Sequence, residues 1–96
     1  MELFIFARFH ARAGRDAAVE AALRDVVPPS RAEPGCRAIA AYRSTRDPSL
    51  FYIHSRWVDE AAFETHATMA HTVRFLERVR PLLDHELEVT RARPLE

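Results

Sequence analysis

The stretch LFYIHSRWVDEAAF, residues 50–63, predicts a β-strand that runs directly into an α-helix. Side chains alternate along residues 50–57 as they do in a strand with two different faces. The apolar face carries Phe51, Ile53 and Trp57, and the more polar face carries Tyr52, His54 and Arg56. Asp59 then supplies a good N-cap for the helix that follows.

A second strand is predicted before this one, from about Cys36 to Ser44. The turn at residues 46–49, which contains Asp47 and Pro48, separates the two strands. Because this connection is short, we expect the strands to pair as an antiparallel hairpin.

The chain begins with another two-faced strand, residues 3–12. One face carries Leu3, Ile5, Ala7 and Phe9, and the other carries Phe4, Phe6, Arg8 and His10. Gly14 and Asp16 end this strand and open a helix, whose apolar stripe is Val19, Ala22, Leu23 and Val26. We expect Pro28 and Pro29 to disturb that helix, and Pro34-Gly35 to end it.

Two further elements follow residue 59. The helical segment that carries Phe63 is expected to break near Thr68, and a second segment then carries Phe75, Leu76, Val79, Leu82 and Leu83. A last strand, residues 86–93, should place Leu87 and Val89 inward and Glu86 and Glu88 outward. The order β-α-β-β-α-β predicts a single α+β domain of the ferredoxin-like class, an antiparallel sheet with its helices on one face.

The predicted sheet has a face without helices, and this face predicts a homodimer. Phe4 and Phe6 lie on it, and a monomer would expose them as an apolar patch. Two sheets packed face to face would bury the patch.

Composition excludes several classes of protein. The formal net charge of zero argues against nucleic acid as the main partner, because such binding needs an excess of basic residues. No apolar run approaches the roughly 20 residues of a membrane span, and the N-terminus does not resemble a signal peptide, so we expect a cytoplasmic protein. The two glycines form no phosphate-binding loop, and the lone Cys36 begins a strand and is read as structural.

Three stretches resemble the antibiotic-biosynthesis-monooxygenase family, whose members form dimeric α/β barrels from ferredoxin-like protomers. They are SRAEPGC at residues 30–36, the strand and helix start at 51–63, and HATMAH at 66–71, with its two histidines five residues apart. The resemblance is colinear from about residue 2 to residue 94.

The sequence departs from the family pattern at several positions. Ser55 stands where the family often has an acidic residue, and Ala70 and Thr72 replace the proline and the aromatic that usually bracket the second histidine. Haem-degrading relatives use an Asn and a Trp where this chain has Ala7 and His66. These last two differences argue against haem degradation.

The oxygenases of this family need no metal, haem or flavin. The resemblance therefore implies an enzyme that has no cofactor and whose substrates are O2 and a small quinol-like aromatic. Triplet O2 reacts slowly with closed-shell molecules, and such a substrate supplies electrons better once it is deprotonated. The protein then needs an apolar cavity, a base, and donors for the anion. His66 and His71 are the candidate bases, since unperturbed imidazole titrates near 6.5. A purely structural role for both histidines stays open.

Six other residues are candidates for binding the substrate. Trp57, Phe51, Ile53 and Phe63 would wall an aromatic pocket, unless they are plain core. Tyr42 and Arg56 would stabilise the anion, unless they lie in solvent or at the dimer interface.

No native metal site is expected, because the five histidines lie on separate elements and no pair has the i, i+4 spacing of helical ligands. The alternative function is a dimeric barrel that binds a small ligand or acts as an isomerase.

Overall fold

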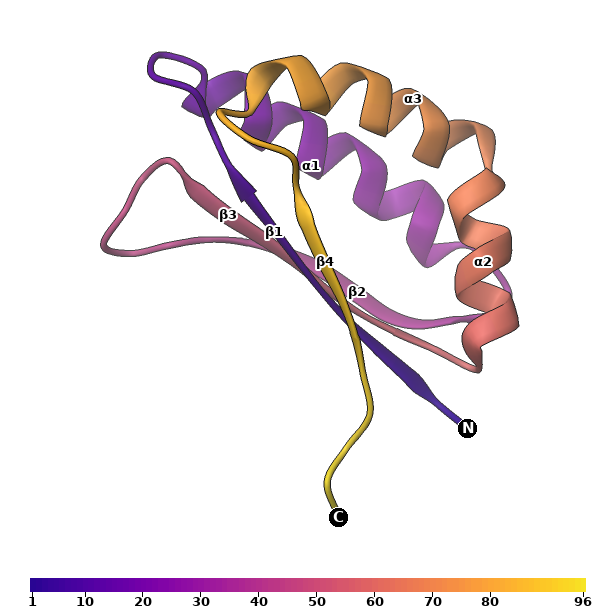
Figure 1. Cartoon of the computed structure of the whole chain (residues 1–96). Helices are drawn as coiled ribbons and strands as arrows, with labels where there is room; N and C mark the ends of the chain where they lie inside the picture. Colours follow the sequence, from indigo (N-terminus) through magenta and orange to yellow (C-terminus); the bar gives the residue numbers. More distant parts are fainter.

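The computed structural model describes all residues, 1–96, and the chain forms one antiparallel sheet covered by helices on one side (Figure 1). The strands are β1 (Leu3–His10), β2 (Cys36–Arg43), β3 (Leu50–Trp57) and β4 (Glu88–Ala92). The helices are α1 (Asp16–Arg31), α2 (Glu60–Thr68), α3 (Ala70–Val79) and the short 3₁₀ turn η1 (Arg80–Leu82). The predicted ferredoxin-like order is confirmed, with its second helix divided into α2 and α3.

The sheet has the strand order β2-β3-β1-β4, and every neighbouring pair is antiparallel. The predicted hairpin of β2 and β3 is confirmed, and Ile39 pairs with Ser55 in it. Strand β1 lies in the middle, where Ala7 pairs with Ile53 on one side and with Val89 on the other. The side chains of alternate residues therefore form rows that cross the whole sheet.

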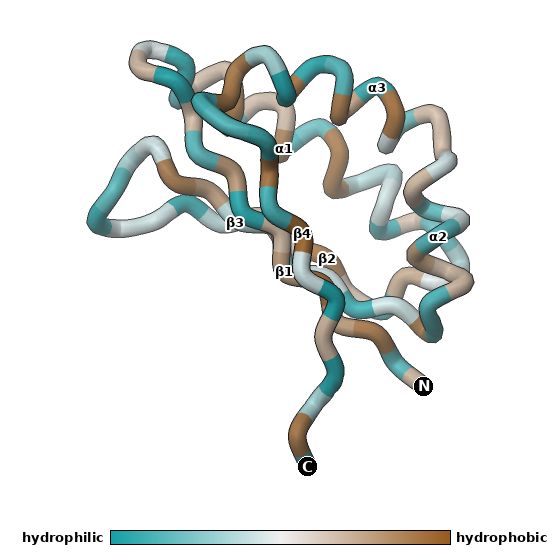
Figure 2. The backbone as a smooth tube through the Cα atoms, in the orientation of Figure 1, coloured by the Kyte–Doolittle hydropathy of each residue, from teal (hydrophilic) through white to brown (hydrophobic).

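The core lies between the sheet and helices α1 and α3, and both helices alternate apolar and polar segments along their length (Figure 2). The predicted inner face of β1 is confirmed, because Ile5, Ala7 and Phe9 are all buried. The ring of Phe9 meets Phe75 of α3 edge-on at 5.8 Å between centroids. The predicted α1 stripe of Val19, Ala22, Leu23 and Val26 is buried beside them.

Two expectations about the helices and strands need correction. Helix α1 continues through Pro28 and Pro29 to Arg31. The prolines remove the N–H donors for the carbonyls of Arg24 and Asp25, but both residues are exposed, so water can hydrate these carbonyls. The last strand begins at Glu88, two residues later than predicted.

The predicted inward placement of Val89 is confirmed, because Val89 shares the sheet face of Ala7 and borders the hollow between the sheet and the helices. Its partner Ala7 is buried, but Val89 lies on the edge strand and remains 48% exposed. Strand β4 is at the edge of the sheet, so Val89 has a neighbouring strand on one side only.

The face of the sheet opposite the helices is open. Phe6 is 50% exposed on this face, and the His54 ring lies beside it at 4.9 Å between centroids. Tyr52 and Tyr42 pair across β3 and β2 on the same face and are also exposed. The predicted location of Phe6 on the uncovered face is confirmed.

Candidate active site

The break between α2 and α3 brings two histidines to one carboxylate. Met69 is extended, with ψ 145°, and this residue ends α2 and begins α3. On one continuous helix His66 and His71 would point about 140° apart. In the structure Glu33 Oε2 lies 2.7 Å from His66 Nδ1 and 2.7 Å from His71 Nε2.

Glu33 comes from the connection between α1 and β2 and is held there by its backbone. Its N–H donates to the Ser30 carbonyl at 3.1 Å, and its carbonyl accepts from the Cys36 N–H at 3.0 Å. Two residues later, Gly35 lets α2 approach closely, because a Cβ at this position would lie 2.5 Å from Ala62 Cβ. The same turn therefore supplies the carboxylate and admits the helix that carries His66.

The hydrogen bonds to Glu33 decide which nitrogen of His66 carries its proton. An ionised carboxylate only accepts hydrogen bonds, so His66 Nδ1 must donate to it. The other nitrogen, Nε2, has no partner in the chain. Arg56 Nε is the only buried side-chain nitrogen or oxygen atom without a hydrogen-bond partner. His66 Nε2 also lacks a partner, so it is not buried and solvent can reach it. In its neutral form, His66 thus presents an unprotonated nitrogen outside the cluster.

A cavity of about 320 Å³ lies between the sheet and the helices, and His66 forms part of its wall. Most of the wall is apolar, and Phe63, Ala67, Phe75, Ile53 and Val89 contribute to it. Ser55, Thr72, Arg80 and Glu86 add polar groups. The Arg80 side chain is half exposed and is paired with Glu86 at 3.1 Å. A mostly apolar wall with a few polar groups is typical of sites that bind small molecules.

Of the aromatic and aliphatic candidates, Phe63 and Ile53 line this cavity. Trp57 is completely buried behind His66, with 4.5 Å between the ring centroids, and its Nε1–H donates to Ser55 Oγ at 3.0 Å. Trp57 therefore supports the base candidate without reaching the cavity. Phe51 is also buried, and it lines a separate groove on the other side of α1.

Tyr42 and Arg56 lie away from the cavity in this chain. Tyr42 is 54% exposed on the open sheet face. Arg56 shares that face, where its guanidinium pairs with Glu2 at 3.1 Å and lies over the Phe4 ring. In place of these two residues, Arg80 is the cation at the cavity wall.

Glu33 and Arg80 were not predicted as site residues, and neither was the carboxylate that His66 and His71 share. His66 and His71 do lie on separate helices, as predicted, but the break at Met69 and the turn at Glu33 still bring their side chains to one carboxylate. One signal was present, since Glu33 lies within the family-like run of residues 30–36.

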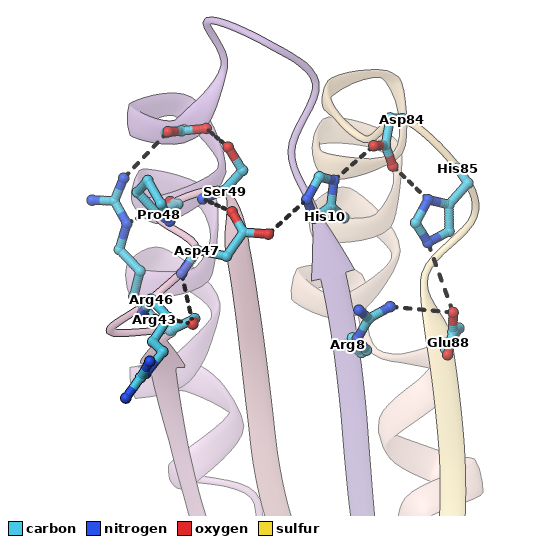
Figure 3. A network of polar contacts seen from close by, with 12 residues as sticks. Arg8, His10, Arg43, Arg46, Asp47, Pro48, Ser49, Asp84, His85 and Glu88 are labelled. Atoms are coloured by element: carbon cyan, nitrogen blue, oxygen red, sulfur yellow. Dashed lines mark hydrogen bonds and ion pairs between the residues drawn. The ribbon is translucent and has the colours of Figure 1, made fainter.

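A second cluster of histidines and carboxylates lies at the far end of the sheet (Figure 3). His10 Nδ1 is 2.6 Å from Asp84 and its Nε2 is 3.1 Å from Asp47, and His85 contacts the other oxygen of Asp84. The hydrogen bonds to Asp84 and then Asp47 raise the pKa of His10. These side chains are 28–49% exposed, and none of them lines the cavity beside His66.

The pKa values of the two carboxyl groups in this second cluster are lowered. For Asp47 the main cause is the hydrogen bond from the Ser49 backbone N–H, with a further contribution from His10. For Asp84, burial opposes ionisation, but the hydrogen bonds from His10 and His85 together outweigh it. The cluster therefore favours a charged His10 between two carboxylates.

No helix of the chain combines the length and the apolar character that crossing a membrane requires.

Known proteins resemble this chain along most of its length. The family model described as antibiotic biosynthesis monooxygenase matches residues 3–78. The Mycobacterium tuberculosis protein named "Putative monooxygenase Rv0793" is 30% identical over 92 residues, covering 96% of this chain and 90% of that protein. The solved structure of Rv0793 superposes with a TM-score of 0.94 at 28% identity, covering 100% of this chain and 97% of that one. PA3566 from Pseudomonas aeruginosa superposes with a TM-score of 0.91 at 34% identity, covering 99% and 95%.

Proposed function

Because the chain belongs to the antibiotic biosynthesis monooxygenase family, we propose that it is a monooxygenase without a cofactor that oxidises a quinol-like or polyphenol-like aromatic. One observation carries this proposal. His66 is bound to buried Glu33 through Nδ1, and it forms part of the wall of a mostly apolar cavity of about 320 Å³.

The first step is removal of a phenolic proton. His66 Nε2 is the acceptor, because Glu33 keeps the proton of the imidazole on Nδ1. The developing imidazolium is then stabilised by the Glu33 carboxylate. The side chains of Glu33 and His66 are only 7% and 12% exposed, so water screens this interaction weakly.

The resulting phenolate needs a positive partner at the cavity wall. Arg80 supplies a guanidinium there, and its present partner, Glu86, is an exposed carboxylate that solvent can stabilise once Arg80 turns to the substrate. The apolar walls contributed by Phe63, Phe75 and Ile53 strengthen this charge interaction by excluding water.

The reaction balances without an outside reductant. A quinol with a free ring C–H and one O2 give a hydroxyquinone and one water. The substrate supplies all four electrons that O2 accepts, one oxygen atom enters the new C–O bond, and the other leaves as water. The proton taken by His66 returns to that water.

We also propose that the working form is a homodimer. The open sheet face carries Phe6 and Tyr42, which are half exposed, and the partly buried Phe4. Packing this face against a second copy removes apolar surface from water, which stabilises the dimer by about 25 cal/mol for each Å² buried.

Oxygen uptake with a panel of substituted hydroquinones tests the proposed activity. We expect uptake above the uncatalysed rate for at least one quinol, unchanged by EDTA and with no bound chromophore in the protein. The matched control is the dimethyl ether of the same quinol, which has no phenolic proton and should not react. If every quinol binds without enzyme-dependent uptake, the ligand-binding or isomerase alternative replaces this proposal.

A further inference from the structure

Glu33 is a buried carboxylate that no arginine neutralises. Its side chain is 7% exposed, and its charged or chargeable partners are the two imidazoles of His66 and His71. Buried charges in proteins are normally paired with an opposite charge or bound to a metal ion. This cluster therefore has the electrostatic character of a cation site.

The donor atoms of the cluster also converge. One oxygen of Glu33, one nitrogen of His66 and one nitrogen of His71 all lie within 4.8 Å of one another. The α1–β2 connection, α2 and α3 each contribute one ligand, so the fold itself holds the three donors together. His71 is 20% exposed and lines a separate surface hollow, which gives an ion a route from solvent.

The chemistry of the donors selects the ion. Two imidazole nitrogens and one carboxylate oxygen suit Zn²⁺ and other late divalent cations of the first transition row. Mg²⁺ and Ca²⁺ prefer sites made only of oxygen. Three protein ligands also leave a coordination position for water.

We propose that Glu33, His66 and His71 bind a divalent transition-metal cation of the Zn²⁺ type, and that this ion inhibits the enzyme. The inhibition rests on the proposed function. Without the ion, Nδ1 of His66 carries the proton and Nε2 is free to accept one. A neutral imidazole bound to metal through Nδ1 keeps its single proton on Nε2, so it has lost the nitrogen that acts as base.

The cluster around His10 provides a matched comparison. Asp84 there also contacts two histidines, His10 and His85, but each of its two oxygens meets a different ring. The donors of that cluster do not converge on one point as those around Glu33 do. Substitutions in the His10 cluster test whether any pair of histidines beside a carboxylate is enough to bind the metal ion.

The binding test is a titration of metal-free protein with Zn²⁺ by calorimetry and with Co²⁺ by visible absorption. We expect one ion per chain, little response to Mg²⁺, and no change in His85→Ala or Asp84→Asn. Loss of a residue that only hydrogen-bonds to a metal ligand weakens metal binding by roughly 10- to 100-fold. Glu33→Gln and His71→Ala each remove a ligand itself, so they should weaken Zn²⁺ binding by more than this. X-ray absorption of the Zn²⁺-loaded parent should show two imidazole ligands, a readout that does not depend on how the variants fold.

Three outcomes would overturn the proposed site: no binding to the parent, unchanged affinity in Glu33→Gln, or loss of binding in His85→Ala. A failure of this kind leaves the proposed oxygenase activity intact. The inhibition is tested on any substrate that the oxygen-uptake panel identifies. Zn²⁺ should inhibit with the same half-saturation as it binds, and EDTA should restore turnover. Binding without inhibition would overturn the inhibitory role and would contradict Nε2 of His66 as the base, while the metal site would stand.

Discussion

His66 Nδ1 lies 2.7 Å from Oε2 of Glu33, a residue 33 positions earlier in the chain. This contact gives the imidazole a defined tautomer, with its unprotonated nitrogen away from the carboxylate. The turn that carries Glu33 therefore determines whether His66 can act as a base. A residue outside the cavity is as important to the proposed chemistry as the residues that line it.

Glu33→Gln should lower turnover by at least about 10²-fold. The amide can donate to Nδ1, which moves the imidazole proton to Nε2, and it cannot stabilise an imidazolium. Steady-state oxygen uptake measures the loss. Asp84→Asn is the control, because it makes the same change beside a histidine that does not line the cavity. Equal losses in the two variants would contradict the role of Glu33.

Phe6→Asp should weaken the dimer by about 100-fold or more, since an unpaired carboxylate buried in an apolar interface costs several kcal/mol. Phe6 is 50% exposed in the single chain, so the fold itself should tolerate the change. Light scattering across a dilution series measures the assembly. A parent protein that is already monomeric at micromolar concentration would disprove the dimer.

Ala67→Leu should raise the KM for the substrate by about 10-fold, because the larger side chain fills part of the cavity. Ala67 is exposed on α2, so the melting temperature should change little. The control is Ala61→Leu on the same helix, which is also exposed but does not line the cavity. An unchanged KM for Ala67→Leu would show that the substrate binds elsewhere.

The His10 cluster should make stability depend on pH. The pKa of His10 is raised above its usual 6.5, so its stabilising contribution is fully present below 6.5 and is lost as the pH rises through the folded-state pKa. The pKa values of Asp47 and Asp84 are lowered below 3.8, so their contribution is present above 3.8 and is lost at lower pH.

The difference in melting temperature between the parent and His10→Gln should therefore be largest between about pH 4 and 6.5 and should shrink above it. Thermal denaturation across this range measures the difference. A difference that stays constant from pH 5 to pH 9 would contradict the assigned ion pairs.

Much of the fold could be predicted because its strands and helices have clear periodicity. The alternation in residues 3–10 and 50–57 is local, and burial on the inner face follows it closely. The extent of α1 could not be predicted from its prolines, because their cost depends on whether the freed carbonyls of Arg24 and Asp25 meet water. The exposure of Val89 goes with its place on the edge strand β4, and no local pattern shows which strand is at the edge.

The site was harder to predict than the fold. His66 and Phe63 could be recognised from the family-like stretches and from their helical spacing. The contact between His66 and Glu33 is a tertiary one and depends on the turn before β2. Arg80 was missed because it lies in the 3₁₀ turn after α3, where the periodicity of helices and strands no longer indicates which way a side chain points.

The central claim is that His66 is the base, and oxygen uptake by His66→Ala and His71→Ala tests it most directly. We predict that His66→Ala loses at least about 10²-fold in turnover while its assembly and melting temperature stay close to those of the parent. His71→Ala should lose less, because His71 contacts Glu33 but does not line the cavity. Near-normal turnover in His66→Ala together with loss in His71→Ala would reverse the assignment, and near-normal turnover in both variants would contradict the proposed chemistry.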